Sequence, residues 1–167
     1  MHIEASMPSK TRFLVFAASI VILVGIFYFV DPRLTSIDPQ KAAVQNANYA
    51  IDDKDYNKAI RILIDATKEY PRNADMRYTL GLAYAGLNQT QYMMSQYLEA
   101  IRIDPYHVSA LFALGQNYLV SGNYDFASQM LGRLQIACNS GKGCHERDML
   151  SGMISREKSL QQNNPAQ

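Results

Sequence analysis

The feature that most constrains the fold is a period of 34 residues in the middle of the chain. Identical residues recur at this distance, in the pairs Leu80 and Leu114, Gly81 and Gly115, Tyr84 and Tyr118, Ala66 and Ala100, and Pro71 and Pro105. Tyr56 and Ala59 return two periods later as Tyr124 and Ala127. A fixed period of this length indicates tandem units, each too small to bury its own apolar face. We therefore expect similar units stacked around a shared core.

The pattern Leu-Gly-x-x-Tyr, followed by an Ala in mid-repeat and a closing Pro, resembles the tetratricopeptide repeat (TPR). The resemblance covers residues 40–136 and is weakest in the opening helix of the first unit, where Ala47 and Ala50 replace a small residue and an aromatic one. It implies an all-α fold: a right-handed α-solenoid of three helical hairpins, at 40–73, 74–107 and 108–140.

Turns and helix ends fit this pattern. Asn88 and Gly122 lie where each hairpin turns, and both residue types tolerate a positive φ. Pro71 and Pro105 are expected to follow the second helices, since proline lacks the backbone donor that a helix interior requires. His107 comes just after Pro105 and is interpreted as a solvated surface residue.

Residues 13–30 form an apolar segment, FLVFAASIVILVGIFYFV, without a charged residue. As a helix these 18 residues span about 27 Å, close to the roughly 30 Å of a bilayer's hydrocarbon core. We expect a transmembrane helix between an N-terminal tail (1–12) and a linker (31–39). A cleaved signal peptide and a buried soluble helix are the alternatives, although the bulky end Phe27–Val30 lacks the small residues of a cleavage site.

The orientation of this segment depends on few charges. Lys10 and Arg12 precede it, whereas Arg33 and Lys41 follow it. The positive-inside preference is slight and favours a cytoplasmic N-terminus. We therefore expect a protein that crosses the inner (cell) membrane of a bacterium once and has its repeats in the periplasm. The opposite orientation, with the repeats in the cytoplasm, is the alternative.

Cys138 and Cys144 bracket a Gly-rich loop at the end of the third unit. Across so tight a loop their Cα atoms can approach within the 4.4–6.8 Å that a disulfide requires, and a disulfide agrees with the periplasm. Two reduced cysteines without a structural or chemical role are an alternative. A zinc site with His145 is another, but it lacks a fourth ligand. Beyond the loop, 144–161 has the apolar spacing of a capping helix, and 162–167 has the composition of a disordered tail.

No pattern of residues predicts chemistry. The chain has no nucleophile motif, phosphate loop or zinc-protease motif, so we expect no enzyme, no cofactor and no small-molecule substrate. Asp52, Asp53 and Asp55 cluster at the first hairpin turn, where the expected role is solvation and N-capping. The net charge of +1 gives no reason to expect nucleic acid as a partner.

The resemblance implies a binding surface instead. In TPR arrays the first helix of each hairpin lines a concave groove, in which a partner segment lies. The residues that the register assigns to this groove are Val44, Asn48, Tyr78, Leu82, Ala85, Phe112, Gln116 and Leu119. Relatives that grip a C-terminal carboxylate use Lys, Arg and Asn at equivalent positions, where only Lys41 and Asn48 have suitable side chains here. The expected partner is therefore a protein that brings a hydrophobic helix or an extended segment.

Together these expectations describe a scaffold anchored in a lipid bilayer by residues 13–30. It is similar to anchored TPR proteins that assist the assembly or stability of membrane or envelope complexes, such as those of cytochrome c maturation or pilus biogenesis. A cytoplasm-facing scaffold, like TPR factors for photosystem assembly, and a permanent accessory subunit are the alternatives.

Overall fold

The structure, a computed structural model, describes residues 38–163. These residues contain seven α-helices. They are α3 (Pro39–Asp52), α4 (Tyr56–Glu69), α5 (Ala74–Gly86), α6 (Thr90–Ile103), α7 (Val108–Val120), α8 (Tyr124–Asn139) and α9 (Cys144–Asn163). The predicted membrane segment 13–30, the tail before it and the linker up to residue 37 lie outside the described residues. Among the helices that are described, none combines the length and the apolar character needed to cross a membrane.

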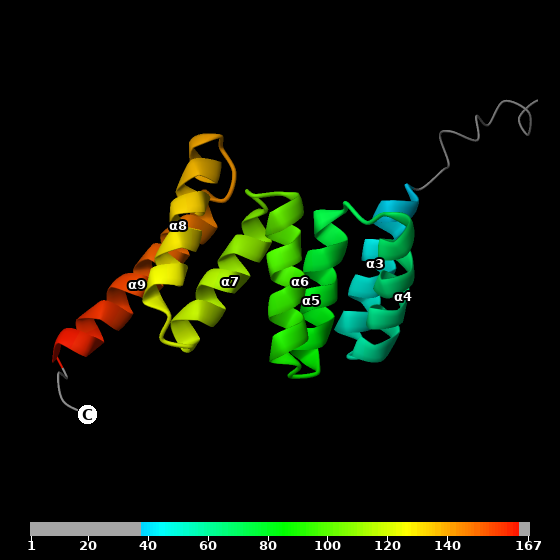
Figure 1. The fold of residues 1–167 in the computed structure, drawn as a ribbon, viewed down its shortest axis with the longest axis horizontal. Helices are drawn as coiled ribbons and strands as arrows, with labels where there is room; N and C mark the ends of the chain where they lie inside the picture. Colours follow the sequence, from blue (N-terminus) through cyan, green and yellow to red (C-terminus); the bar gives the residue numbers. More distant parts are fainter. Residues whose placement is uncertain (1–37, 164–167) are drawn as a thin grey trace, which may run out of the picture. The chain divides into compact units, whose positions relative to one another are not determined.

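Six of the helices form three hairpins in chain order, α3/α4, α5/α6 and α7/α8, and α9 packs against both α7 and α8 (Figure 1). This arrangement confirms the predicted all-helical solenoid of the described residues. Each helix pairs with the helix next to it in the chain, because each connection is only a few residues long.

The residues that were expected to end helices do so. Asn88 and Gly122 have φ values of 57° and 73° at the second and third hairpin turns. Helix α4 ends at Glu69 and α6 at Ile103, two residues before Pro71 and Pro105. The Asp55 carboxylate accepts a hydrogen bond of 3.0 Å from the Lys58 backbone N–H, which confirms the predicted cap of α4.

The buried side chains fall into two clusters whose boundary lies inside the middle hairpin, although α5 and α6 contact each other more than any other pair of described helices. One cluster of buried side chains comes from α3, α4 and α5, including Leu63, Met76 and Leu80. The other comes from α6 to α9, including Leu111 and Leu134. Tyr84 packs against both clusters. Helices α3 and α5 also contact each other extensively, whereas α5 and α7 do so very little.

Helix α9 covers the end of the second cluster. Its Leu150 and Ile154 are buried against α7 and α8. A Cβ atom on Gly115 of α7 would lie 2.5 Å from a methyl carbon of Leu150, so only glycine permits this seating. Sulfur atoms of Cys138 and Cys144 are bonded across the preceding loop, with their Cα atoms 4.6 Å apart. The disulfide therefore joins the end of α8 to the start of α9.

Candidate protein-binding face

The predicted groove residues occupy equivalent positions on three helices. Each is related to the next by 34 residues, as in Val44, Tyr78 and Phe112, or Asn48, Leu82 and Gln116. Within a helix their spacing of three or four residues places them along one side. We call these eight residues of α3, α5 and α7 the inner face.

Their accessibility varies. Asn48 is exposed, whereas Val44 and Gln116 are partly buried. Partly buried apolar side chains of α5 and α7 pack against the α6–α9 core cluster; they are Tyr78, Leu82, Ala85 and Phe112. Leu119 is only 7% exposed and belongs to that cluster, so it contributes packing and little accessible surface.

Tyr78 connects three neighbouring elements. Its ring stacks on that of Tyr97 in α6, with centroids 5.6 Å apart, and lies 5.4 Å from the imidazole of His107. Burial raises the pKa of the Tyr78 phenol, and a hydrogen bond with the Ser109 side chain partly opposes that rise. Tyr78 therefore connects α5 with α6 and with the start of α7, in addition to being part of the inner face.

Tyr97 is more deeply buried than Tyr78, at 2% exposure. Desolvation raises the pKa of its phenol strongly, and the neighbouring Tyr78 adds to the rise. Its ring also fills the space beside Gly81, where a Cβ would collide with it. The pair Tyr78 and Tyr97 is thus a packing element under the inner face and not a reactive one.

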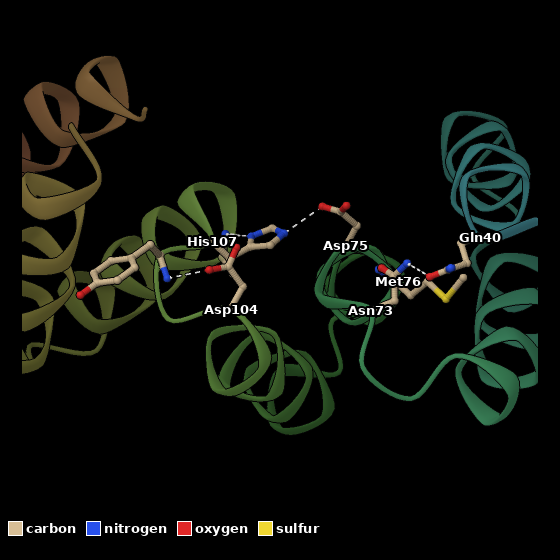
Figure 2. A network of polar contacts seen from close by, with 8 residues as sticks. Gln40, Asn73, Asp75, Met76, Asp104 and His107 are labelled. Carbon is tan, nitrogen blue, oxygen red and sulfur yellow. Dashed lines mark hydrogen bonds and ion pairs between the residues drawn. The ribbon is translucent and has the colours of Figure 1, made fainter. Parts of the chain in front are cut away.

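Polar contacts join the starts of successive first helices (Figure 2). Asn73 caps α5 by accepting a hydrogen bond of 2.9 Å from the Met76 backbone N–H. Its side-chain amide also donates to Gln40 of α3 over 2.9 Å. One side chain therefore caps the start of a helix and links that helix to the preceding hairpin.

His107, 34 residues after Asn73, repeats this arrangement (Figure 2). Its Nδ1 accepts a hydrogen bond of 3.2 Å from the Ala110 backbone N–H and so caps α7. With Nδ1 as acceptor, the neutral ring carries its proton on Nε2, which lies 3.0 Å from Asp75 Oδ1. The side chain of His107 is 10% exposed, so the interpretation of His107 as a solvated surface residue is wrong.

A hollow of about 310 Å³ opens at the α3 end of the inner face. Its lining includes Val44 and Asn48 of the inner face. Three further carboxamide residues, Gln40, Gln45 and Asn73, surround it, with Lys41 and Asp75 as its charged residues. Carboxamides both donate and accept, which suits them to the N–H and C=O groups of an extended peptide.

Two stacked aromatic pairs were not anticipated from the sequence. Tyr84 stacks on Tyr92 with ring centroids 5.2 Å apart, and Tyr118 stacks on Phe126 at 5.1 Å. Residues 92 and 126 are themselves 34 positions apart, so the recurrence of an aromatic there was the available signal. Each pair joins the two helices of one hairpin near its turn.

Nothing among the described residues indicates a reactive centre. Within residues 38–163, no group of three or more His, Cys, Asp or Glu side chains is placed to hold a metal ion. The zinc hypothesis at Cys138, Cys144 and His145 also fails on chemistry, because sulfurs bonded to each other are not thiolate ligands.

Comparison with known proteins supports the fold. No family model matches the sequence, and no curated protein matches it. Among solved structures, the chain is similar to the Sgt2 TPR domain from Aspergillus fumigatus, with a TM-score of 0.63 and 20% identity over 77% of this chain and 83% of that one. It is also similar to the type III secretion translocator chaperone SycD of Yersinia enterocolitica, with a TM-score of 0.65 and 15% identity over 77% of this chain and 91% of that one.

A third similar structure is the TPR2AB domain of yeast Sti1 in a pHSP90 complex. Its TM-score is 0.60 at 19% identity, and the match covers 91% of this chain and 58% of that one. These identities are low, but the similarity in three dimensions extends over most of the chain. The hairpins α3 to α8 therefore have the TPR fold.

Proposed function

We propose that this protein binds another polypeptide along the inner face and acts as a scaffold. The observation that carries the proposal is the repetition of uncharged residues at the same positions of α3, α5 and α7. A face built this way offers apolar contacts, interrupted by carboxamides, to a single extended or helical ligand.

The chemistry of the face defines the partner. Apolar edges of Tyr78, Leu82 and Phe112 favour a segment with hydrophobic side chains. Asn48 and Gln116 supply carboxamides that pair with backbone groups of that segment. The apolar residues on α5 and α7 leave no cluster of Lys and Arg there for a terminal carboxylate.

We further propose that residues 13–30 anchor the scaffold in the inner membrane with the repeats in the periplasm, where it assists the assembly or stability of a membrane or envelope complex. Anchoring raises the effective concentration of the scaffold for membrane partners. A cytoplasm-facing scaffold and a permanent accessory subunit are the alternatives. Labelling Cys138 and Cys144 in intact cells with a membrane-impermeant thiol reagent, before and after reduction, distinguishes the two orientations.

The structural neighbours support a protein-binding role. One is named as a translocator chaperone, and another was solved in a complex with pHSP90. Both carry their function on the same fold, although fold alone does not identify a partner.

Site-specific crosslinking in intact membranes tests the proposal. A photo-crosslinking amino acid at Asn48 or Gln116 is expected to capture a defined partner, identified by mass spectrometry. The same group at Ile136, an exposed residue of α8, serves as the control. Equal capture from all three positions would argue against the inner face as the binding site.

A matched pair of substitutions gives a second test. Phe112→Lys places a charge on the inner face, while Leu98→Lys places one at a 43%-exposed position on α6. The lysine stem lets its charge reach water at either position, so both variants are expected to fold. Only Phe112→Lys should reduce crosslinking from Asn48.

A further inference from the structure

Within residues 38–163, helix α9 is not followed by a second helix as α3, α5 and α7 are. Helices α3, α5 and α7 each pack along the second helix of their own hairpin. Helix α9 follows α8 in the place of a fourth first helix, yet no described residues follow it to form a second one. The side of α9 that points away from α7 and α8 is therefore uncovered within residues 38–163.

Three apolar residues and one arginine form a line along α9 at the edge of this uncovered side, and one of them, Met153, also packs in part against the α6–α9 core cluster. Met149, Met153, Arg156 and Leu160 follow one another at spacings of four, three and four residues, which places them on a single side of the helix. Met149 is 42% exposed and Leu160 is 53% exposed. We call this line of four residues the α9 ridge.

A hollow of about 550 Å³ lies beside the ridge, where the ends of α7 and α9 approach the start of α8. Its apolar lining includes Val120, Tyr124, Met153 and Leu160. Val120 is 90% exposed, the highest value among the exposed large apolar residues of the described region. Exposed apolar residues gathered around one hollow are typical of an interaction site.

Gly152, next to the ridge, allows another helix to approach. It lies inside α9, where glycine costs about 1 kcal/mol relative to alanine. A Cβ atom added there would meet no atom within 4 Å, so no contact within the described residues requires glycine. The same test gives close contacts at Gly81, Gly86 and Gly115, and none at Gly132 of α8.

The charges at the hollow favour a second copy of this chain as the occupant. The charged side chains that line it are Arg156 and Glu157, adjacent residues of opposite sign. Two copies related by a two-fold axis between positions 156 and 157 would place each Arg156 beside Glu157 of the other copy. If the axis is perpendicular to α9, the two α9 helices are antiparallel, the relation found within every hairpin (Figure 1).

We infer that α9 is a homodimer interface, in which the α9 helix of a second copy packs antiparallel along the α9 ridge. The same register brings Met153 of one copy against Leu160 of the other, so these two side chains become buried in both copies. This inference does not depend on the proposed function, because its contacts are made by α9 and Leu119 is the one inner-face residue that lines the same hollow.

Charge reversal in the full chain tests the interface. Light scattering of the purified full chain in detergent, with bound detergent subtracted, should give twice the chain mass of 18.8 kDa. Arg156→Glu and Glu157→Arg each turn two attractive contacts into repulsive ones, so each should raise the dimer dissociation constant about tenfold or more. An equimolar mixture of the two variants restores opposite charges and should dimerise like the wild type.

Lys158→Glu is the matched control, since Lys158 is exposed on α9 but lies off the ridge, and it should leave the dimer unchanged. Far-UV circular dichroism checks that all variants keep their helices. A monomeric wild type would overturn the inference, as would association that both charge reversals leave unchanged. The latter outcome would assign the association to another segment, such as residues 13–30.

Discussion

The Nε2 atom of His107 lies 3.0 Å from Oδ1 of Asp75, although the two residues begin different hairpins. Helices α5 and α7 have little direct contact, so this pair and the Tyr78 ring carry much of the connection between them. The same imidazole caps α7 through Nδ1. His107 therefore has the same two structural roles as Asn73 in the preceding repeat. Each side chain caps the start of a helix and links that helix to the hairpin before it.

Replacing His107 with alanine should lower the free energy of unfolding by about 1 kcal/mol, because α7 loses its N-cap. His107→Asn should recover most of that loss, since asparagine is among the best capping residues. Urea denaturation followed by circular dichroism measures both. Asp75→Ala isolates the link between hairpins, and because Asp75 is 76% exposed its effect should stay below about 1 kcal/mol.

Stability should fall at alkaline pH through Tyr97. The pKa of its phenol is raised in the folded state, so above pH 10, the ordinary pKa of tyrosine, the unfolded chain loses this proton more readily than the folded chain. Its contribution to stability is therefore complete below pH 10 and declines above it. Tyr97→Phe should have a flatter dependence of the urea midpoint on pH between 9 and about 11. A wild-type midpoint as flat as that of Tyr97→Phe would contradict this account.

The seating of α9 on α7 is tested at Gly115. Gly115→Ala places a methyl 2.5 Å from Leu150 and should cost about 1–3 kcal/mol, despite the higher helix propensity of alanine. Gly132→Ala is the matched control, because a Cβ there meets nothing within 4 Å; it should stabilise α8 by up to about 1 kcal/mol. Both are measured by urea denaturation.

Combining Gly115→Ala with Leu150→Ala identifies the contact responsible. Leu150→Ala alone should cost about 2–5 kcal/mol, since the side chain is fully buried. In the double variant the shortened side chain leaves room for the new methyl, so the cost should be less than the sum. Strict additivity would show that Leu150 is not what Gly115 accommodates.

The disulfide should contribute about 2 kcal/mol, as expected for a loop closed between residues six positions apart. Cys138→Ser and Cys144→Ser should each lower the free energy of unfolding by that amount under non-reducing conditions. With a dithiol reductant present, the wild type should become as unstable as the variants. An unchanged wild type would mean that the cysteines are already reduced in the purified protein.

The sequence predicted the fold where a local rule decides the structure. Pro71 and Pro105 follow helix ends because the ring removes a donor, and Asn88 and Gly122 turn the chain because they accept a positive φ. Residues at 34-residue spacing were assigned to equivalent helix positions, and those positions lie on the first helix of each hairpin.

What the sequence did not predict depends on contacts between distant residues. Histidine is not a preferred capping residue, so nothing local indicated that His107 caps α7 or reaches Asp75. Leu119 was assigned to the groove from its position in the repeat, yet it is buried in the α6–α9 cluster. The repeat position of a residue in the last turn of a helix does not show whether neighbouring helices bury its side chain. The contact of Leu150 with Gly115 lies beyond the last repeat, where the period no longer applies.

The division of the core inside the middle hairpin has a consequence for how the domain comes apart. Helices α5 and α6 belong to one repeat in sequence but to different groups of buried side chains, with Tyr84 as the residue common to both. Cooperative unfolding follows shared burial and not repeat boundaries. The three leading helices are therefore expected to exchange their amide protons as one block and the remaining four as another, so that the boundary between the two energetic units falls inside the middle repeat.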